Sequence, residues 1–104
     1  MILTTANDIP GREVSEVVGI ARGNTVRARH VGRDITAMFK NIVGGEISEY
    51  TKLQADAREQ ALQRMVQDAE RHGADAIIAM RIETSIVTNG AAEIVAYGTA
   101  VKLR

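Results

Sequence analysis

The chain has 104 residues, of which 45% are hydrophobic and 25% are charged, with 13 lysines and arginines and 13 acidic residues. This composition indicates one soluble domain, residues 1–104, because chains this short seldom divide into two cores. The balanced charge gives no general argument for binding to nucleic acid, a membrane surface or a highly charged substrate. The absence of cysteine excludes disulfides, thiolate metal ligands and a cysteine nucleophile.

The first residues, "MILTTANDIPGREV", lack a basic start followed by a long apolar run, and no stretch approaches the length that spans a bilayer. We therefore expect a cytoplasmic protein with no membrane partner. The apolar residues are mostly Ala, Val and Ile, and the aromatic residues are Phe39, Tyr50 and Tyr97. Because large aromatic side chains normally dominate burial and small domains bury a smaller share of their surface, we expect the core to be completed by association of several copies.

The first predicted element is a β-hairpin. The segment "REVSEVVGIARG" carries a β-branched run, and "TVRARHV" resumes a strand-like alternation after Gly23-Asn24. Glycine and asparagine tolerate the positive φ of a tight turn. The pattern therefore predicts a hairpin that turns at Gly23-Asn24 and has a short second arm over residues 25–31.

A short amphipathic helix is predicted next, starting near Asp34, because "GRDITAMFKNIVGG" places its apolar residues at helical spacing. Gly44-Gly45 follows it and relieves the steric cost of positive φ at a corner between two helices. A phosphate loop is the alternative for this segment. Glu46 and Glu49 argue against a phosphate loop. Two carboxylates at the N-terminus of a helix interact favourably with the helix dipole and would repel a phosphate.

The longest helix is predicted from about Thr51 to His72, with Thr51 and Gln54 at the spacing of a capping box. Its apolar stripe consists of Leu53, Ala57, Ala61, Met65 and Ala69, flanked by Leu62 and Val66. Because three stripe positions are alanine, we expect the helix to lie close to the layer it covers. The helix should end at Gly73, a residue typical of the left-handed position after a helix.

In the C-terminal third of the chain, Asn89-Gly90 is a strong hairpin signal. It predicts two long antiparallel strands, one before and one after this turn. The segments "AIIAM" and "IVAYGTAV" are nearly continuous in apolar residues, which is typical of strands covered on both faces. One helix layer can cover one face only. We therefore expect a second copy of the chain to cover the other face.

The segments "VGGE", "AR", "GADA" and "AYGTAV", in this order along nearly the whole chain, resemble the YbjQ-like family of small prokaryotic proteins, which are often labelled heavy-metal-binding. The resemblance implies an α+β, dodecin-like unit, in which a helix packs on a three-stranded antiparallel sheet. The residue patterns above add the short extra strand over residues 25–31 and the short helix near Asp34. The resemblance also implies assembly as a ring, a homopentamer. It carries no catalytic residues over to this sequence. The heavy-metal label departs from the composition, because soft metals select thiolates.

His30 and His72 are the only histidines, and they lie on different predicted elements. Zinc sites normally need three or four clustered ligands, so we expect no metal site within one subunit and identify no cofactor. A site between subunits, from His30 and a carboxylate such as Asp34, stays open. His72 is explained by its place in the last helical turn, where a cation meets the dipole favourably.

The candidate nucleophiles Ser15, Ser48 and Ser85 lie outside any nucleophile-elbow motif, and no carboxylate pair is marked for acid–base chemistry. We therefore expect a protein that is not an enzyme, and that binds itself and either a small ligand or a metal ion.

The one local excess of charge is "ARGNTVRARHVGRD". Arg27, Arg29 and His30 form a candidate anion site, in which the two arginines would share one face of an extended arm. The alternative is a charged edge strand that avoids unwanted pairing. The second functional hypothesis is therefore weak binding of an anion or of nucleic acid through the Arg22–Arg33 arm, although nucleic acid is disfavoured by the balanced charge of the chain.

Overall fold

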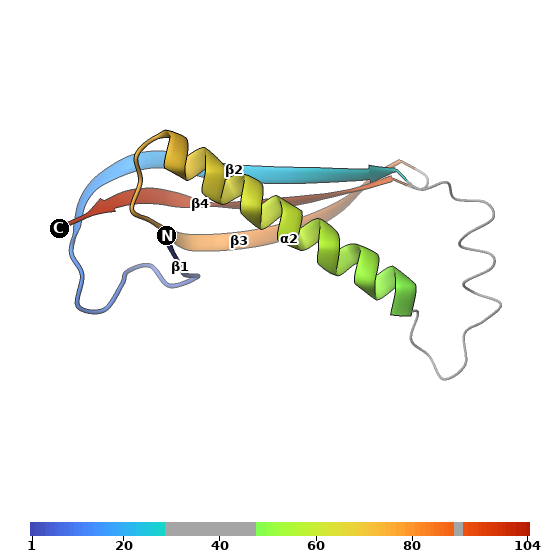
Figure 1. The fold of residues 1–104 in the computed structure, drawn as a ribbon, viewed down its shortest axis with the longest axis horizontal. Helices are drawn as coiled ribbons and strands as arrows, with labels where there is room; N and C mark the ends of the chain where they lie inside the picture. The colour runs from blue at the N-terminus through green and yellow to red at the C-terminus, as the bar shows by residue number, and fades with distance from the viewer. Residues whose placement is uncertain (29–47, 89–90) are drawn as a thin grey trace.

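The computed structural model describes residues 1–28, 48–88 and 91–104. In these ranges the chain forms four strands and one helix: β1 (Ile2–Leu3), β2 (Val14–Ala28), α2 (Ser48–Arg71), β3 (Ala76–Thr88) and β4 (Ala91–Leu103). The predicted α+β class, with a long helix packed on a sheet, is confirmed (Figure 1). The predicted helix near Asp34 and the corner at Gly44-Gly45 lie outside the described residues.

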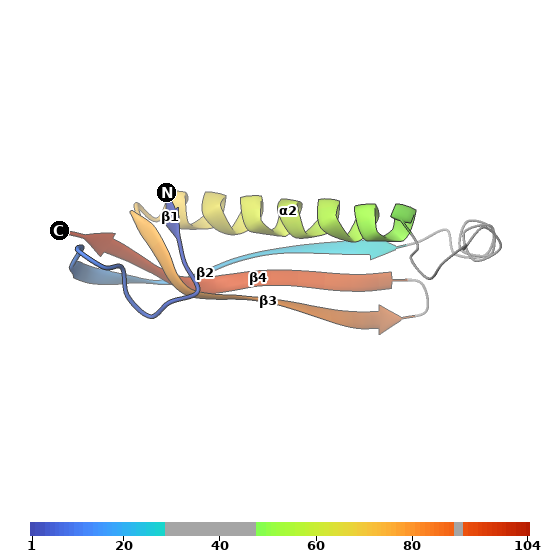
Figure 2. The same ribbon diagram turned by 90° about the horizontal axis from the view of Figure 1, so that it is seen from below.

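The strand order in the sheet is β1-β3-β4-β2, with β2 and β3 antiparallel to the central strand β4 and with β1 parallel to β3. The sheet contains the three long antiparallel strands that the resemblance implies. The short extra strand expected from Thr25 onward is instead part of β2, and the short strand β1 at the N-terminus was not predicted. Helix α2 runs along the strands on one side of the sheet (Figure 2). Among the described residues, no helix is long and apolar enough to cross a membrane.

The predicted hairpin at Gly23-Asn24 is wrong, because β2 passes straight through these residues from Val14 to Ala28. Gly23 instead marks the place where the helix comes closest to the sheet. A Cβ atom at Gly23 would lie 2.6 Å from the carbonyl carbon of Arg64, and closer still to Met65 N and Ala61 O. The glycine therefore provides room for helix backbone and does not form a turn.

Helix α2 begins at Ser48, three residues before the predicted start, and ends at Arg71. The capping box at Thr51 and Gln54 is therefore wrong, since Thr51 lies inside the first turns. A threonine inside a helix costs only a few tenths of a kcal/mol, up to about 0.7, relative to alanine, so its helix propensity does not exclude Thr51 from α2.

The C-terminal end of α2 is the predicted glycine stop. Gly73 has φ +76°, its N–H donates to Glu70 O at 3.0 Å, and the N–H of Ala74 donates to Ala69 O at 3.1 Å. This pair of hydrogen bonds is a Schellman motif, which satisfies carbonyl groups that have no partner within the helix. The motif turns the chain directly into β3.

The core lies between α2 and one face of the sheet. The stripe residues Ala57, Ala61, Met65 and Ala69 are all buried, as predicted. They pack against small side chains on the strands, including Ala21, Ala96 and Ala100. Thr25 is the one buried polar side chain among the described residues, and its hydroxyl donates to Ala57 O at 3.1 Å, so its burial carries no unpaired group.

The antiparallel pair β3 and β4 is confirmed, although the turn residues Asn89-Gly90 lie outside the described residues. Strand β3 contains a register shift between Ile78 and Arg81, where Ala79 has φ +52°. The N-terminal segment holds this bulge, because Ala79 N–H donates to Ala6 O at 2.8 Å and Met80 N–H donates to Thr4 O at 3.1 Å. A left-handed alanine costs about 1 kcal/mol, and these bonds offset that cost.

Candidate functional site

The predicted anion site does not come together within the described residues. Arg27 lies in β2 opposite Ala92, while Arg29 and His30 lie outside the described part of the chain. Arg22, at the start of the basic arm, lies in the same continuous strand as Arg27. The hairpin that would have made residues 25–31 a separate arm is absent from β2.

The strand register instead brings other polar residues together on the sheet face opposite α2, which we call the outer face. Arg22 pairs with Tyr97 across β2 and β4, and Tyr97 pairs with Arg81 across β4 and β3. Alternate residues of a strand lie on opposite faces, and Ala21 and Ala96 are buried beneath the helix. Arg22, Tyr97 and Arg81 therefore form one row across the outer face.

The neighbouring rows of the outer face follow from the same register. Toward the β3–β4 hairpin lies a row of Asn24, Val95 and Glu83, and then a row of Val26, Glu93 and Ser85. On the other side of the arginine row lie Ile20, Thr99 and Ile78. Ile20 is 74% exposed and Val26 is 56% exposed, so apolar side chains at both ends of this face are open to solvent.

Both carboxylates of the outer face have partners in their own chain. The Tyr97 hydroxyl donates to Glu83 Oε1 at 3.1 Å, and Asn24 Nδ2 donates to Glu93 Oε2 at 3.1 Å. The hydrogen bond and the negative charge of Glu83 raise the pKa of Tyr97 above its usual value of 10.0, because they favour the neutral phenol. Tyr97 is therefore a hydrogen-bond donor at neutral pH and is not poised as a catalytic base.

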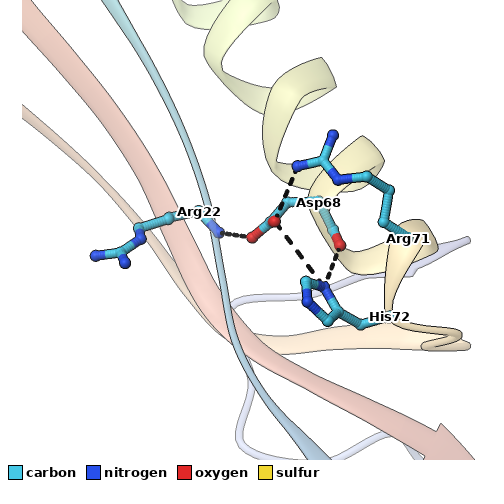
Figure 3. Close-up of polar contacts among 4 residues, drawn as sticks. All are labelled: Arg22, Asp68, Arg71 and His72. Carbon is cyan, nitrogen blue, oxygen red and sulfur yellow. Dashed lines mark hydrogen bonds and ion pairs between the residues drawn. The ribbon is translucent and has the colours of Figure 1, made fainter.

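Side chains of α2 hold the free edge of β2 (Figure 3). Asp68 Oδ2 accepts the backbone N–H of Arg22 at 3.1 Å, and the Arg64 guanidinium donates to Asn24 O at 2.6 Å. The hydrogen bond from Arg22 N–H is the largest cause that lowers the pKa of Asp68, and Arg71, 3.0 Å from Asp68 Oδ1, adds to it. These bonds cover backbone groups that an edge strand otherwise offers to other strands.

His72 lies one residue beyond the end of α2. Its Nδ1 is 2.8 Å from Asp68 O, and a carbonyl oxygen can only accept, so Nδ1 carries the proton. The histidine thus satisfies a carbonyl at the end of the helix. The prediction from the sequence places it within the last helical turn, one residue earlier than the structure does. Figure 3 shows the Arg22 guanidinium extending away from this cluster, on the opposite side of the strand from Asp68.

Metal-ligating residues do not gather in the described ranges, where no group of three or more His, Cys, Asp or Glu side chains could hold an ion. The possible pair of His30 and Asp34 lies outside these ranges. Ser15 Oγ donates to the backbone oxygen of Lys102 at 3.2 Å, so its hydroxyl contacts no general base. No group of metal ligands is therefore assembled in the described part of the subunit, and Ser15 is not placed as a nucleophile.

Comparison with known proteins matches residues 1–104 to the YbjQ family model, described as "Putative heavy-metal-binding". A UPF0145 protein of Archaeoglobus fulgidus is 57% identical over 104 residues, covering 100% of this chain and 96% of that protein. A UPF0145 protein of Halobacterium salinarum is 53% identical over 103 residues, covering 99% of each chain. These relatives are not named as enzymes.

The fold is similar to a crystal structure of a DUF74-family protein of unknown function from Pediococcus pentosaceus. The TM-score is 0.67 at 17% sequence identity, and the match covers 100% of this chain and 98% of that one. At this identity the likeness bears on the fold alone. The family model and the relatives above half identity together establish that the chain belongs to the YbjQ family of UPF0145 proteins.

Proposed function

We propose that the protein is a non-enzymatic, ring-forming homo-oligomer, a pentamer as the family resemblance implies, and that any small ligand or metal ion is bound between subunits. The observation that carries this proposal is the outer face of the sheet. Strands β2 and β4 present Ile20, Val26 and Val95 there, and no described element of the subunit covers them. The rows of Arg22 and Asn24 lie between Ile20 and Val26, and an uncovered sheet face that mixes apolar and polar side chains in this way is typical of an interface between proteins.

The mutational test uses the two faces of β4. Ile94 is 4% exposed and lies beneath α2, whereas Val95 lies on the outer face. We expect Val95→Lys to lower the oligomer size while the subunit keeps its helix and sheet content. We expect Ile94→Lys to unfold the subunit, because it buries an unpaired charge.

Sedimentation velocity of the untagged protein at micromolar concentration measures the assembly. We expect a species several times the 11.2 kDa mass of the subunit. A stable, cooperatively folded monomer would contradict the proposal. Native mass spectrometry of the same sample reports the number of subunits and any retained ligand in one measurement.

The heavy-metal label of the family does not fit the donor set of this subunit. The chain has no cysteine, and soft ions such as Cu(I) and Cd²⁺ prefer thiolates. Calorimetric titration of the untagged protein with zinc, Cu(I) and cadmium tests this argument, and we expect weak binding without a fixed stoichiometry. One ion per subunit with submicromolar affinity would contradict it, and loss of that affinity in His30→Ala would locate the site at His30.

The alternative of anion binding through the Arg22–Arg33 arm gains no support from the described contacts, and we do not favour it. Its test remains simple. If Arg27 and Arg29 bind an anion, sulfate should raise the melting temperature more than chloride at equal ionic strength, and the double change Arg27→Ala, Arg29→Ala should remove that difference. Equal effects of the two salts would dismiss the alternative.

A further inference from the structure

We propose that the outer face of the sheet binds the solvent-exposed face of helix α2 from a second copy of the chain. This inference rests on the proposed assembly and names the two surfaces that make it. The outer face offers apolar side chains and a row with two arginines, while the helix offers a surface of carboxylates and amides. The contact joins different surfaces on the two copies, so it is heterologous.

Five exposed positions of α2 form a face without a positive charge. Residues 56, 59, 63, 67 and 70 recur at helical spacing and are all exposed: Asp56, Glu59, Gln63, Gln67 and Glu70. Three are carboxylates, two are amides and none is basic. Arg64 and Arg71 lie toward the edge of β2 instead, where they contact Asn24 O and Asp68. An arginine-bearing surface is the natural complement of this face.

The outer face has arginine groups available for such a contact. The Arg22 guanidinium makes no ion pair or hydrogen bond with the described residues, and it extends away from α2 (Figure 3). Arg81 Nη1 is fixed by Thr5 O at 3.1 Å and Met80 O at 2.7 Å, which leaves its positive charge without a carboxylate partner. Both charges lie in the row of Tyr97, whose phenol adds apolar area between them.

The spacing of the two surfaces also agrees. Rows of one sheet face repeat every two residues, about 6.8 Å along an antiparallel strand. Helix positions four residues apart repeat at about 6.0 Å. With Glu59 over the arginine row, Gln63 falls over the row of Glu83 and Gln67 falls over the row of Glu93. Amide donors then face the carboxylates. In the opposite helix direction, with Glu70 over the arginines, the order of side chains is the same, but the first step, from Glu70 to Gln67, is only about 4.5 Å, so the fit is poorer.

A second outer face is a less suitable occupant. Packing two outer faces together would leave the three helix carboxylates without partners. It would also close the assembly at two subunits, because such a contact is isologous. When the sheet of one subunit contacts the helix of another, each pair still has one free sheet face and one free helix face. Further subunits can therefore add at both ends until the assembly closes into a ring.

Charge reversal tests the two surfaces separately. We expect Arg22→Glu to raise the dissociation constant of the assembly at least about tenfold, which corresponds to about 1.4 kcal/mol. Either Glu59→Arg or Glu70→Arg should do the same, and whichever does so reports the helix direction. Combining that change with Arg22→Glu in one chain should recover most of the lost affinity. The matched controls Arg12→Glu and Asp8→Arg reverse exposed charges outside both faces.

Cysteine crosslinking tests the geometry without background, because the chain has no native cysteine. Val95→Cys places a thiol on the outer face, and Gln63→Cys places one on the exposed face of α2. A short bismaleimide should link the two variants when they are mixed, and should link neither variant to itself. The double variant should give a ladder of covalent species up to the full ring.

The outcomes separate this inference from the proposed assembly. A monomeric parent protein would overturn both. An oligomer in which Val95→Cys links only to itself would keep the assembly and show an isologous sheet contact, which overturns the inference. An oligomer that tolerates Arg22→Glu and gives no link between Val95→Cys and Gln63→Cys would overturn it as well.

Discussion

The close approach of α2 to β2 predicts that Gly23→Ala is among the most destabilising small changes in the chain. The added Cβ would lie 2.6 Å from Arg64 C, where ordinary contact begins at 3.4 Å, and it would meet backbone atoms that cannot rotate away. The helix must therefore move outward along this stretch. Overpacking of this kind typically costs about 1–3 kcal/mol, and more where backbone has to shift.

The same displacement would stretch three hydrogen bonds that join α2 to β2: Thr25 Oγ1 to Ala57 O, Arg22 N to Asp68 Oδ2 and Arg64 Nη1 to Asn24 O. At about 1 kcal/mol each, their loss would bring the total to about 4–6 kcal/mol. A domain of this size has a free energy of unfolding of about 5–15 kcal/mol, so Gly23→Ala should remove about a third of it or more.

Urea denaturation followed by circular dichroism, at one fixed protein concentration, measures the effect. The control is Gly19→Ala in the same strand, where nothing lies within 4 Å of the added Cβ and only the backbone, with φ +149°, is strained. We expect the control to cost about 1 kcal/mol. If Gly23→Ala costs no more than Gly19→Ala, the close helix contact is not what requires the glycine.

Three further changes test individual contacts. In the folded protein the pKa of Asp68 lies below its ordinary value of 3.8, so its carboxylate stabilises the fold. This stabilisation is complete above about pH 4 and is lost as the pH falls through the folded pKa. The loss in free energy of unfolding caused by Asp68→Asn should therefore shrink in acid. A deficit that is constant from pH 7 to about pH 2 would contradict this account. Ala79→Gly should raise the free energy of unfolding by about 0.5–1 kcal/mol, because glycine relieves the backbone strain at φ +52°. The control Ala100→Gly, at a buried position in β4, should lower the free energy of unfolding. The midpoints of urea denaturation compare the two variants directly. In a Tyr50→Phe background, an ultraviolet titration should show that Tyr97 ionises above pH 10.0. Glu83→Gln should bring the pKa of Tyr97 back toward that value. If Glu83→Gln leaves the titration of Tyr97 unchanged, the hydrogen bond to Glu83 is contradicted.

The sequence predicted those parts of the fold that depend on local patterns. The alanine stripe of α2, the stop at Gly73 and the antiparallel pair β3 and β4 all follow from periodicity and from glycine chemistry. The same reliance on local patterns gave the wrong prediction of a turn at Gly23-Asn24. Glycine serves equally in a turn and beneath a close helix, and only the position of α2 distinguishes the two uses.

The outer-face row could not be read from the sequence because it depends on register. Counting outward from the pair of Thr88 and Ala91 would place Arg81 opposite Gly98, but a shift between Ile86 and Thr88 places it opposite Tyr97. A slip of one residue moves a side chain to the other face of the sheet. Arg81 and Tyr97 share a face only because of this bulge, and no local signal marks it.

Incomplete burial on both sides of the sheet connects the strand pattern with the assembly. Helix α2 packs mainly on β2 and less on β3, so Ile82, on the helix side of β3, is 39% exposed. On the opposite side Ile20 and Val26 are exposed through their positions on the outer face. The continuous apolar strands thus predict a sheet that is covered on both faces. Within one subunit, helix α2 covers only part of one face. The proposed ring would cover the outer face, because each subunit would then meet two neighbours through two different surfaces.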